Sequence, residues 1–227
     1  FLFRVKFWRI MPFTFKTNCD VMASNDFRES FEASSNKIPE CWQVKQIAAG
    51  YGEGEDYGEE AIVVYEPKST LEPGVVVDVA KHGNKVLMFK KSKKGTRTAI
   101  ITQAMHMDQV GMYDVSFWMY RNSKETQVGT DLLSDDVRVL VNNTPDTIGA
   151  IELDYINSFY GHTPIVDGPG YYLYEYNIPL SGEVYFMIEA ISEVGEADLF
   201  VDDIQVYPAP TCRKIKNIEM LPPTKNQ

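Results

Sequence analysis

Residues 172–191 read YLYEYNIPLSGEVYFMIEAI, and this stretch decides the fold class. Polar and apolar side chains alternate on either side of Ser181 and Gly182, a pair typical of a turn. The stretch therefore predicts two strands, 172–178 and 185–191, because successive side chains of a strand point to opposite faces. Helical periodicity is nearly absent from the rest of the chain.

The same alternation predicts further strands at 27–31, 75–79, 85–89, 113–119, 137–141 and 199–206. Turn signals rich in Gly, Pro and Asn separate them, at 72–74, 82–84, 142–145 and 167–170. Many short strands at this spacing indicate an all-β, two-sheet antiparallel jelly-roll sandwich. We expect one domain over 26–207. Residues 1–25 are expected to be the end of a preceding β domain or a linker, and 208–227 a linker and the start of a following domain.

Composition argues against two classes of function, nucleic-acid binding and membrane insertion. The 227 residues carry a net charge of −10, which argues against nucleic acid as a partner, because phosphate binding needs clustered Lys and Arg. No run of eighteen apolar residues occurs, so no membrane insertion is expected. The three cysteines show neither a metal-ligand spacing nor a redox pair.

Acidic residues gather at the two ends of the predicted domain. The first and last strands of a jelly roll commonly pair, so acids in 26–32 and 199–206 are expected to converge. Alternation places Asp202 on the same strand face as the apolar Phe200, Ile204 and Val206. A carboxylate on an apolar face needs a hydrogen-bond donor or a cation. Calcium is one interpretation, since it binds carboxylates and backbone carbonyls. The other is that Asp202 accepts backbone N–H groups at a turn.

A family resemblance rests on the order of several motifs: FRESFE at 27–32, PECW at 39–42, HGNKVLMF at 82–89, DDVRVLVNNTPDTIGAIEL at 135–153, YYLYEYNIP at 171–179 and YFMIEAISEVGEADLFVDDIQV at 185–206. In this order they resemble the MAM-like jelly-roll modules of Bacteroidetes surface proteins and the cleaved-adhesin (haemagglutinin) domains of gingipain-type proteins. The flanks, 1–19 and 210–221, resemble the end and the start of fibronectin type III repeats.

The resemblance implies a secreted or cell-surface module, associated with the outer membrane, that binds a glycan or a host or matrix protein. It also implies a structural Ca2+ ion. The family's acids match Glu32, Asp202 and Asp203, and Asn84 and Lys85 match the turn whose backbone carbonyl often completes the site. A disulfide between Cys19 and Cys41, leaving Cys212 over, is one possible pairing. The Asp-Gly-Asp run of the gingipain adhesins is missing, which puts a second calcium site in doubt.

An enzyme is the alternative from another class. Residues 150–157, AIELDYIN, resemble the catalytic strand of jelly-roll glycoside hydrolases, with Glu152 and Asp154 expected on one face. Asn157 stands at the third position, where it cannot act as a general acid. The chain is therefore predicted to be non-catalytic, with a degenerate or active hydrolase kept as the alternative. A purely structural spacer between neighbouring domains is a third interpretation.

Aromatic side chains supply the candidate ligand contacts. Exposed rings would stack on sugar rings or form a protein-binding hot spot. Alternating tyrosines also fit a half-buried strand, and this interpretation stays open. The candidates are Trp118, Tyr120, Tyr155, Tyr160 and Tyr172.

Overall fold

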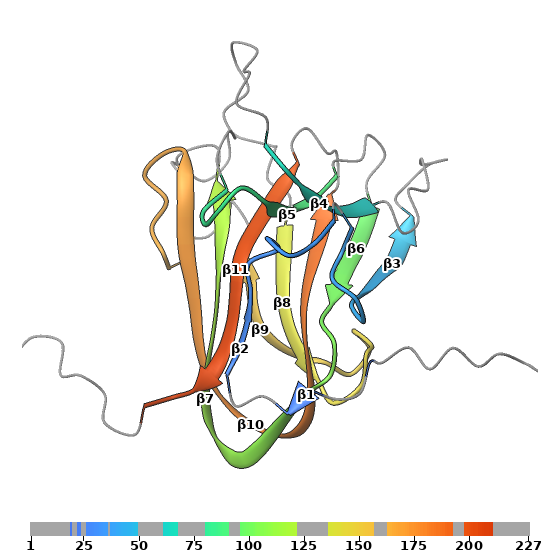
Figure 1. Cartoon of the computed structure of the whole chain (residues 1–227), viewed down its shortest axis with the longest axis vertical. Coiled ribbons are helices and arrows are strands. Elements are labelled where there is room, and N and C mark those ends of the chain that lie inside the picture. The colour runs from blue at the N-terminus through green and yellow to red at the C-terminus, as the bar shows by residue number, and fades with distance from the viewer. Residues whose placement is uncertain are drawn as a thin grey trace, which may run out of the picture.

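The computed structural model describes residues 19, 22–23, 26–35, 37–49, 61–67, 80–90, 96–121, 136–156, 163–192 and 198–210. The elements in these ranges are strands, which confirms the all-β prediction (Figure 1). They are β1 (Met22–Ala23), β2 (Phe27–Glu29), β3 (Gln43–Ala49), β4 (Ile62–Tyr65), β5 (Val86–Phe89), β6 (Thr96–Ile101), β7 (Met105–Arg121), β8 (Asp136–Asn142), β9 (Ile151–Ile156), β10 (Gly170–Ser192) and β11 (Leu199–Pro208).

Two sheets enclose the core. Sheet A has β7 at its centre, between β11 and the first part of β10. On its far side, β11 pairs with β5 near its start and with β2 further along, and β5 pairs with β4. Sheet B has the order β3, β6, the last part of β10, β8 and β9. The short β1 pairs with β7 in parallel, and all the other pairs named here are antiparallel.

The strand β10 belongs to both sheets, which corrects the predicted turn at Ser181 and Gly182. It is one strand of 23 residues. Its residues up to Val184 pair with β7 in sheet A, and those from Tyr185 pair with β8 in sheet B. The register shifts between Leu180 and Gly182, and Gly182 has a φ of 68°. A bulge bends a strand in this way, so the Gly signal marks a bend and not a hairpin.

Alternating residues fill the core between the sheets. On β7 the odd-numbered positions 113–119 are buried, and on β8 the odd-numbered positions 137–141. Phe117 stacks on Tyr174 with ring centroids 5.4 Å apart and contacts Phe186 of sheet B at 6.1 Å. Each buried side chain of this size contributes about 1.5–3 kcal/mol. The period-two pattern of the sequence therefore identifies the core correctly.

Several predictions fall outside the described residues. These are the strand at 75–79, Tyr160, Asn157, Cys212 and most of both flanks, so the flanking domains stay a prediction. A disulfide joins Cys19 to Cys41, the pairing considered from the sequence. Among the described residues, no helix is long and apolar enough to cross a membrane.

Candidate functional site

The strands at the two ends of the predicted domain, β2 and β11, do pair, with Ile204 opposite Glu29. Their acids meet at the turn of residues 81–85. Glu32 Oε1 accepts the backbone N–H groups of Asn84 and Lys85 at 2.9 and 2.7 Å. Asp202 Oδ2 accepts the backbone N–H of His82 at 2.9 Å. Pairing of distant strands thus brings Glu32 and Asp202 to one turn.

A bulge in β11 corrects the predicted face of Asp202. The register shifts between Asp202 and Gln205, and Asp203 has a φ of 51°. Val201 before the bulge and Ile204 after it both lie in the main core. In a regular strand, two residues three positions apart point to opposite faces, so the bulge has shifted the alternation by one residue. Asp202 therefore lies on the opposite face from Ile204, although it is fully buried.

Nitrogen donors surround the two aspartates. Asp202 Oδ1 accepts the backbone N–H of Asp203 at 2.7 Å. Asp203 Oδ1 accepts a hydrogen bond from Arg28 Nε at 2.8 Å, and its Oδ2 accepts one from Gln205 Nε2 at 2.9 Å. His82 Nδ1 lies 3.2 Å from the same Oδ2. Burial raises the pKa of Asp202 to about 6, against the opposing effect of the backbone N–H groups.

This arrangement does not fit a calcium ion held by the five predicted residues. Calcium takes six to eight oxygen ligands, but both carboxylate oxygens of Asp202 and of Asp203 face N–H donors. Asn84 and Lys85 turn their N–H groups toward Glu32. Among the described residues, no three His, Cys, Asp or Glu side chains form a group that could hold a metal. Calcium binding by the protein stays a prediction.

Two predicted aromatic residues, Trp118 and Tyr120, lie on the outer face of sheet A. Lys81 Nζ lies 3.8 Å from the centroid of the Trp118 ring, within the range of a cation–π contact. Tyr120 packs edge-on against Tyr171, at 5.4 Å, and Phe200, at 6.5 Å. Both side chains are therefore half-buried by contacts within the chain.

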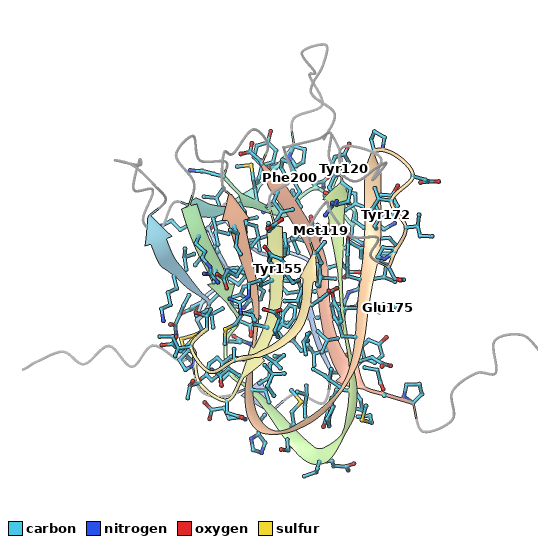
Figure 2. All side chains as sticks on the ribbon, turned by 180° about the vertical axis from the view of Figure 1, so that it is seen from behind. Met119, Tyr120, Tyr155, Tyr172, Glu175 and Phe200 are labelled. Carbon is cyan, nitrogen blue, oxygen red and sulfur yellow. A yellow bond between two sulfur atoms is a disulfide. The ribbon has the colours of Figure 1, made fainter. Side chains whose placement is uncertain are left out.

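The predicted Tyr155 and Tyr172 differ in exposure. Tyr172 packs against the main core, and its hydroxyl donates to the carbonyl of Gly168 at 2.7 Å. Tyr155 is 37% exposed, and its hydroxyl donates to the carboxylate of Asp136. Figure 2 shows Tyr155 over sheet B and Tyr172 on the first part of β10. Tyr172 is therefore half-buried, which is one of the two interpretations that the sequence left open.

The pair proposed for a glycoside hydrolase is divided between two faces of β9. A register shift places Glu152 opposite Leu140 and Asp154 opposite Val139, with one extra residue between them. Glu152 Oε2 accepts a hydrogen bond from Arg138 Nε at 2.6 Å on the outer face. Asp154 Oδ2 instead accepts one from the hydroxyl of Tyr176, which packs against the core, at 3.0 Å. The predicted common face is wrong because of the bulge.

An ionic ladder, formed by Arg97, Glu189, Arg138 and Glu152, crosses the outer face of sheet B. It links β6, β10, β8 and β9. Glu189 is fully buried between the two arginines, with Oε1 bound by Arg97 Nε and Oε2 3.1 Å from a terminal nitrogen of Arg138. The four charges neutralise one another. This ladder could not be predicted from the sequence, because its members come from four strands.

A shallow hollow of about 760 Å3 lies beside β2 and β11 on the outer face of sheet A, and we call it the β2–β11 hollow. Gln205 lies opposite Arg28 in the register, and Tyr207 lies opposite Asp114 of β7. Burial, with Asp114 and Glu175, raises the pKa of the Tyr207 hydroxyl. The lining residues are Asp26, Arg28, Gln205, Tyr207 and Pro208.

The β2–β11 hollow was not predicted from the sequence either. The signal was present, since Gln205 and Tyr207 alternate with the buried Ile204 and Val206 and so had to face outward. The partners on β2 could not be identified from the sequence, because their positions depend on the register between β2 and β11.

Comparison with solved structures shows the fold. The K1 cleaved adhesin domain of Lys-gingipain from Porphyromonas gingivalis W83 is similar with a TM-score of 0.51 and 13% identity, over 82% of this chain and 99% of that domain. The fold is that of a cleaved adhesin domain. The K3 domain of the same protein has a TM-score of 0.49 at 13% identity, covering 79% of this chain and 95% of that one.

A weaker likeness is to TmCBM61 in complex with β-1,4-galactotriose. Its TM-score is 0.44 at 16% identity, covering 79% of this chain and 94% of that one. No family model matches the sequence, and no curated protein matches it. The likeness to the K1 domain shows an adhesin-like fold, whereas the MAM-like and fibronectin type III resemblances stay predictions.

Proposed function

We propose that this chain is a non-catalytic, extracellular binding module that recognises a neutral glycan at the β2–β11 hollow. The observation that carries the proposal is the set of side chains around the hollow. A tyrosine ring, a carboxylate, an amide and a guanidinium lie side by side at Tyr207, Asp26, Gln205 and Arg28. A concave site with a few convergent polar groups is the usual form of a small-ligand site.

Sugar chemistry matches these groups. A sugar ring has an apolar C–H face, on which an aromatic ring can stack, and a rim of hydroxyls that donate and accept hydrogen bonds. Tyr207 offers the ring, Asp26 accepts, Arg28 donates, and Gln205 can do both. The net charge of −10 disfavours a polyanionic glycan. A neutral glycan of a host or matrix surface is therefore the proposed partner.

Two further observations support a non-catalytic module outside the cell. Glu152 and Asp154 lie on opposite faces of β9 and each has a partner of its own, which does not suit a carboxylate pair flanking one glycosidic bond. The disulfide between Cys19 and Cys41 is of the kind that persists in oxidising compartments. We therefore propose a secreted or cell-surface location, next to other domains of the same chain.

The test is a glycan array followed by calorimetric titration of the glycans that bind. Tyr207→Ala is expected to weaken binding at least about tenfold, because an aromatic anchor typically contributes more than 1 kcal/mol. Tyr155→Ala is the matched control, since it removes a tyrosine ring of the opposite sheet and should leave affinity unchanged. Both variants should remain folded, as judged from their melting temperatures.

Two outcomes would refute the proposal. If Tyr155→Ala abolished binding and Tyr207→Ala did not, the site would lie on sheet B. If the chain bound no glycan but captured a deglycosylated matrix protein, the partner would be protein.

A further inference from the structure

We infer that Lys85 supplies the positive charge that calcium was expected to supply, so that the fold is held at this point without a divalent cation. The groups concerned join the loop of residues 31–35 to the turn of residues 81–85. We call them the lysine clasp, which consists of Glu32, Ser34, Gly83, Asn84 and Lys85. The inference is independent of the ligand proposed for the β2–β11 hollow.

The ammonium group of Lys85 lies among oxygens of the loop. Lys85 Nζ donates hydrogen bonds to the backbone carbonyls of Ser34 and Glu32, the second at 3.2 Å. Backbone carbonyls are also ligands that calcium takes in proteins. An ammonium is a compact cation with three donors, so it can bind such oxygens while staying part of the chain. Lys85 thereby provides hydrogen bonds to two carbonyl oxygens that could otherwise bind a metal ion.

The carboxylate of Glu32 completes the clasp from the other side. Its Oε1 accepts hydrogen bonds from the N–H groups of Asn84 and Lys85. The loop and the turn are therefore joined both by the Glu32 carboxylate and by the Lys85 ammonium. Gly83 has a φ of 64°, and a Cβ there would lie 2.3 Å from the Glu32 carboxyl carbon. A side chain at this position would be strained by the left-handed conformation and would displace the Glu32 carboxylate. The turn is therefore built around this carboxylate.

Every carboxylate oxygen of the two neighbouring aspartates already accepts a hydrogen bond. Asp203 already contacts the cationic side chain of Arg28, and both oxygens of Asp202 accept backbone N–H groups. A calcium ion would have to displace Lys85 or turn these donors away. A ligand that binds only the folded state stabilises it by mass action, and no such contribution from calcium is expected here.

The experiment is thermal unfolding of the chain in excess calcium chloride and in excess EGTA at equal ionic strength. The wild-type melting temperature is expected to be the same in both within about 1 °C. Lys85→Met keeps the apolar stem but removes the donors, and it should lower the melting temperature by about 5 °C. Lys37→Met is the matched control, because Lys37 is an exposed lysine of the adjoining segment, and it should have no effect.

Either of two results would overturn the inference. One is a wild-type melting temperature that rises with calcium and falls with EGTA, while magnesium has no such effect. The other is a Lys85→Met variant as stable as Lys37→Met. The first does not depend on whether any variant folds.

Discussion

Among the described residues, Glu189 of sheet B and Asp202 of sheet A are both completely buried, and the two carboxylates are held in different ways. Glu189, on the outer face of sheet B, lies between the guanidinium groups of Arg97 and Arg138. Asp202, on the outer face of sheet A, is bound by the backbone N–H groups of His82 and Asp203. Glu189 therefore lies beside two full positive charges, whereas Asp202 lies beside the dipoles of uncharged backbone N–H groups.

The difference shows what each kind of partner contributes. A guanidinium compensates both the charge and the lost hydration of a buried carboxylate, and it makes the carboxylate and the arginines depend on one another. Backbone N–H groups supply hydrogen bonds without a net charge, so burial still raises the pKa of Asp202 to about 6. Glu189 should therefore dominate the response to mutation, and Asp202 the response to pH.

The largest effect is expected from Glu189→Ala, which breaks the ionic ladder at its centre. It leaves two partly buried arginines without their shared partner, so the free energy of unfolding should fall by about 3 kcal/mol. Urea denaturation measures this. The matched control is Glu175→Ala, an exposed acid of the same strand, which should change stability by less than about 0.5 kcal/mol. Equal effects of the two substitutions would show that the ladder does not stabilise the sheet.

A smaller effect is expected from pH at Asp202. Its pKa is raised in the folded state, so protonation favours folding. The resulting stability is fully present below the unfolded value of 3.8 and is lost as the pH rises through about 6. From about pH 4.5 to about pH 7.5, the wild type should lose about 2 kcal/mol relative to Asp202→Asn.

Denaturation of both proteins across this pH range measures the difference. Because the comparison is between the two pH profiles, any constant cost of the substitution itself cancels. Parallel profiles would mean that Asp202 does not titrate in this range.

The smallest effect is expected at the exposed end of the ladder. Glu152 is bound to Arg138 but is 43% exposed, so water screens the pair. Glu152→Gln should change the free energy of unfolding by less than about 0.5 kcal/mol. Arg138→Met also removes a partner of Glu189 and should lower the free energy of unfolding by more than about 1 kcal/mol. Urea denaturation measures both. A large loss in Glu152→Gln would place the centre of the ladder at β9.

Local patterns predicted several core strands but missed β3, β4 and β6, and they predicted none of the bulges. Alternation located the strands around Phe117, Val139 and Val201, because burial on one face selects apolar residues at every second position. A bulge adds one residue, and the pattern has no means of showing it. The errors at Gly182, in β11 and in β9 are all of this kind.

The candidate sites divide in the same way. Pairing between the two ends of the domain could be predicted, and it brought Glu32 and Asp202 to one turn. The partners of these acids could not, because the donor of one hydrogen bond to Asp202 lies 120 positions away in the chain. The clasp around Lys85 and the hollow around Tyr207 depend on such distant contacts.

The sequence by itself determined the all-β class, the main core strands and the outward position of Gln205 and Tyr207, because these follow from side-chain alternation within one strand. Only the tertiary structure decided that β10 joins both sheets, that Glu152 and Asp154 lie on opposite faces of β9, and that backbone N–H groups bind Glu32 and Asp202. These features depend on register between strands far apart in the chain, and a shift of one residue there exchanges the faces of a strand.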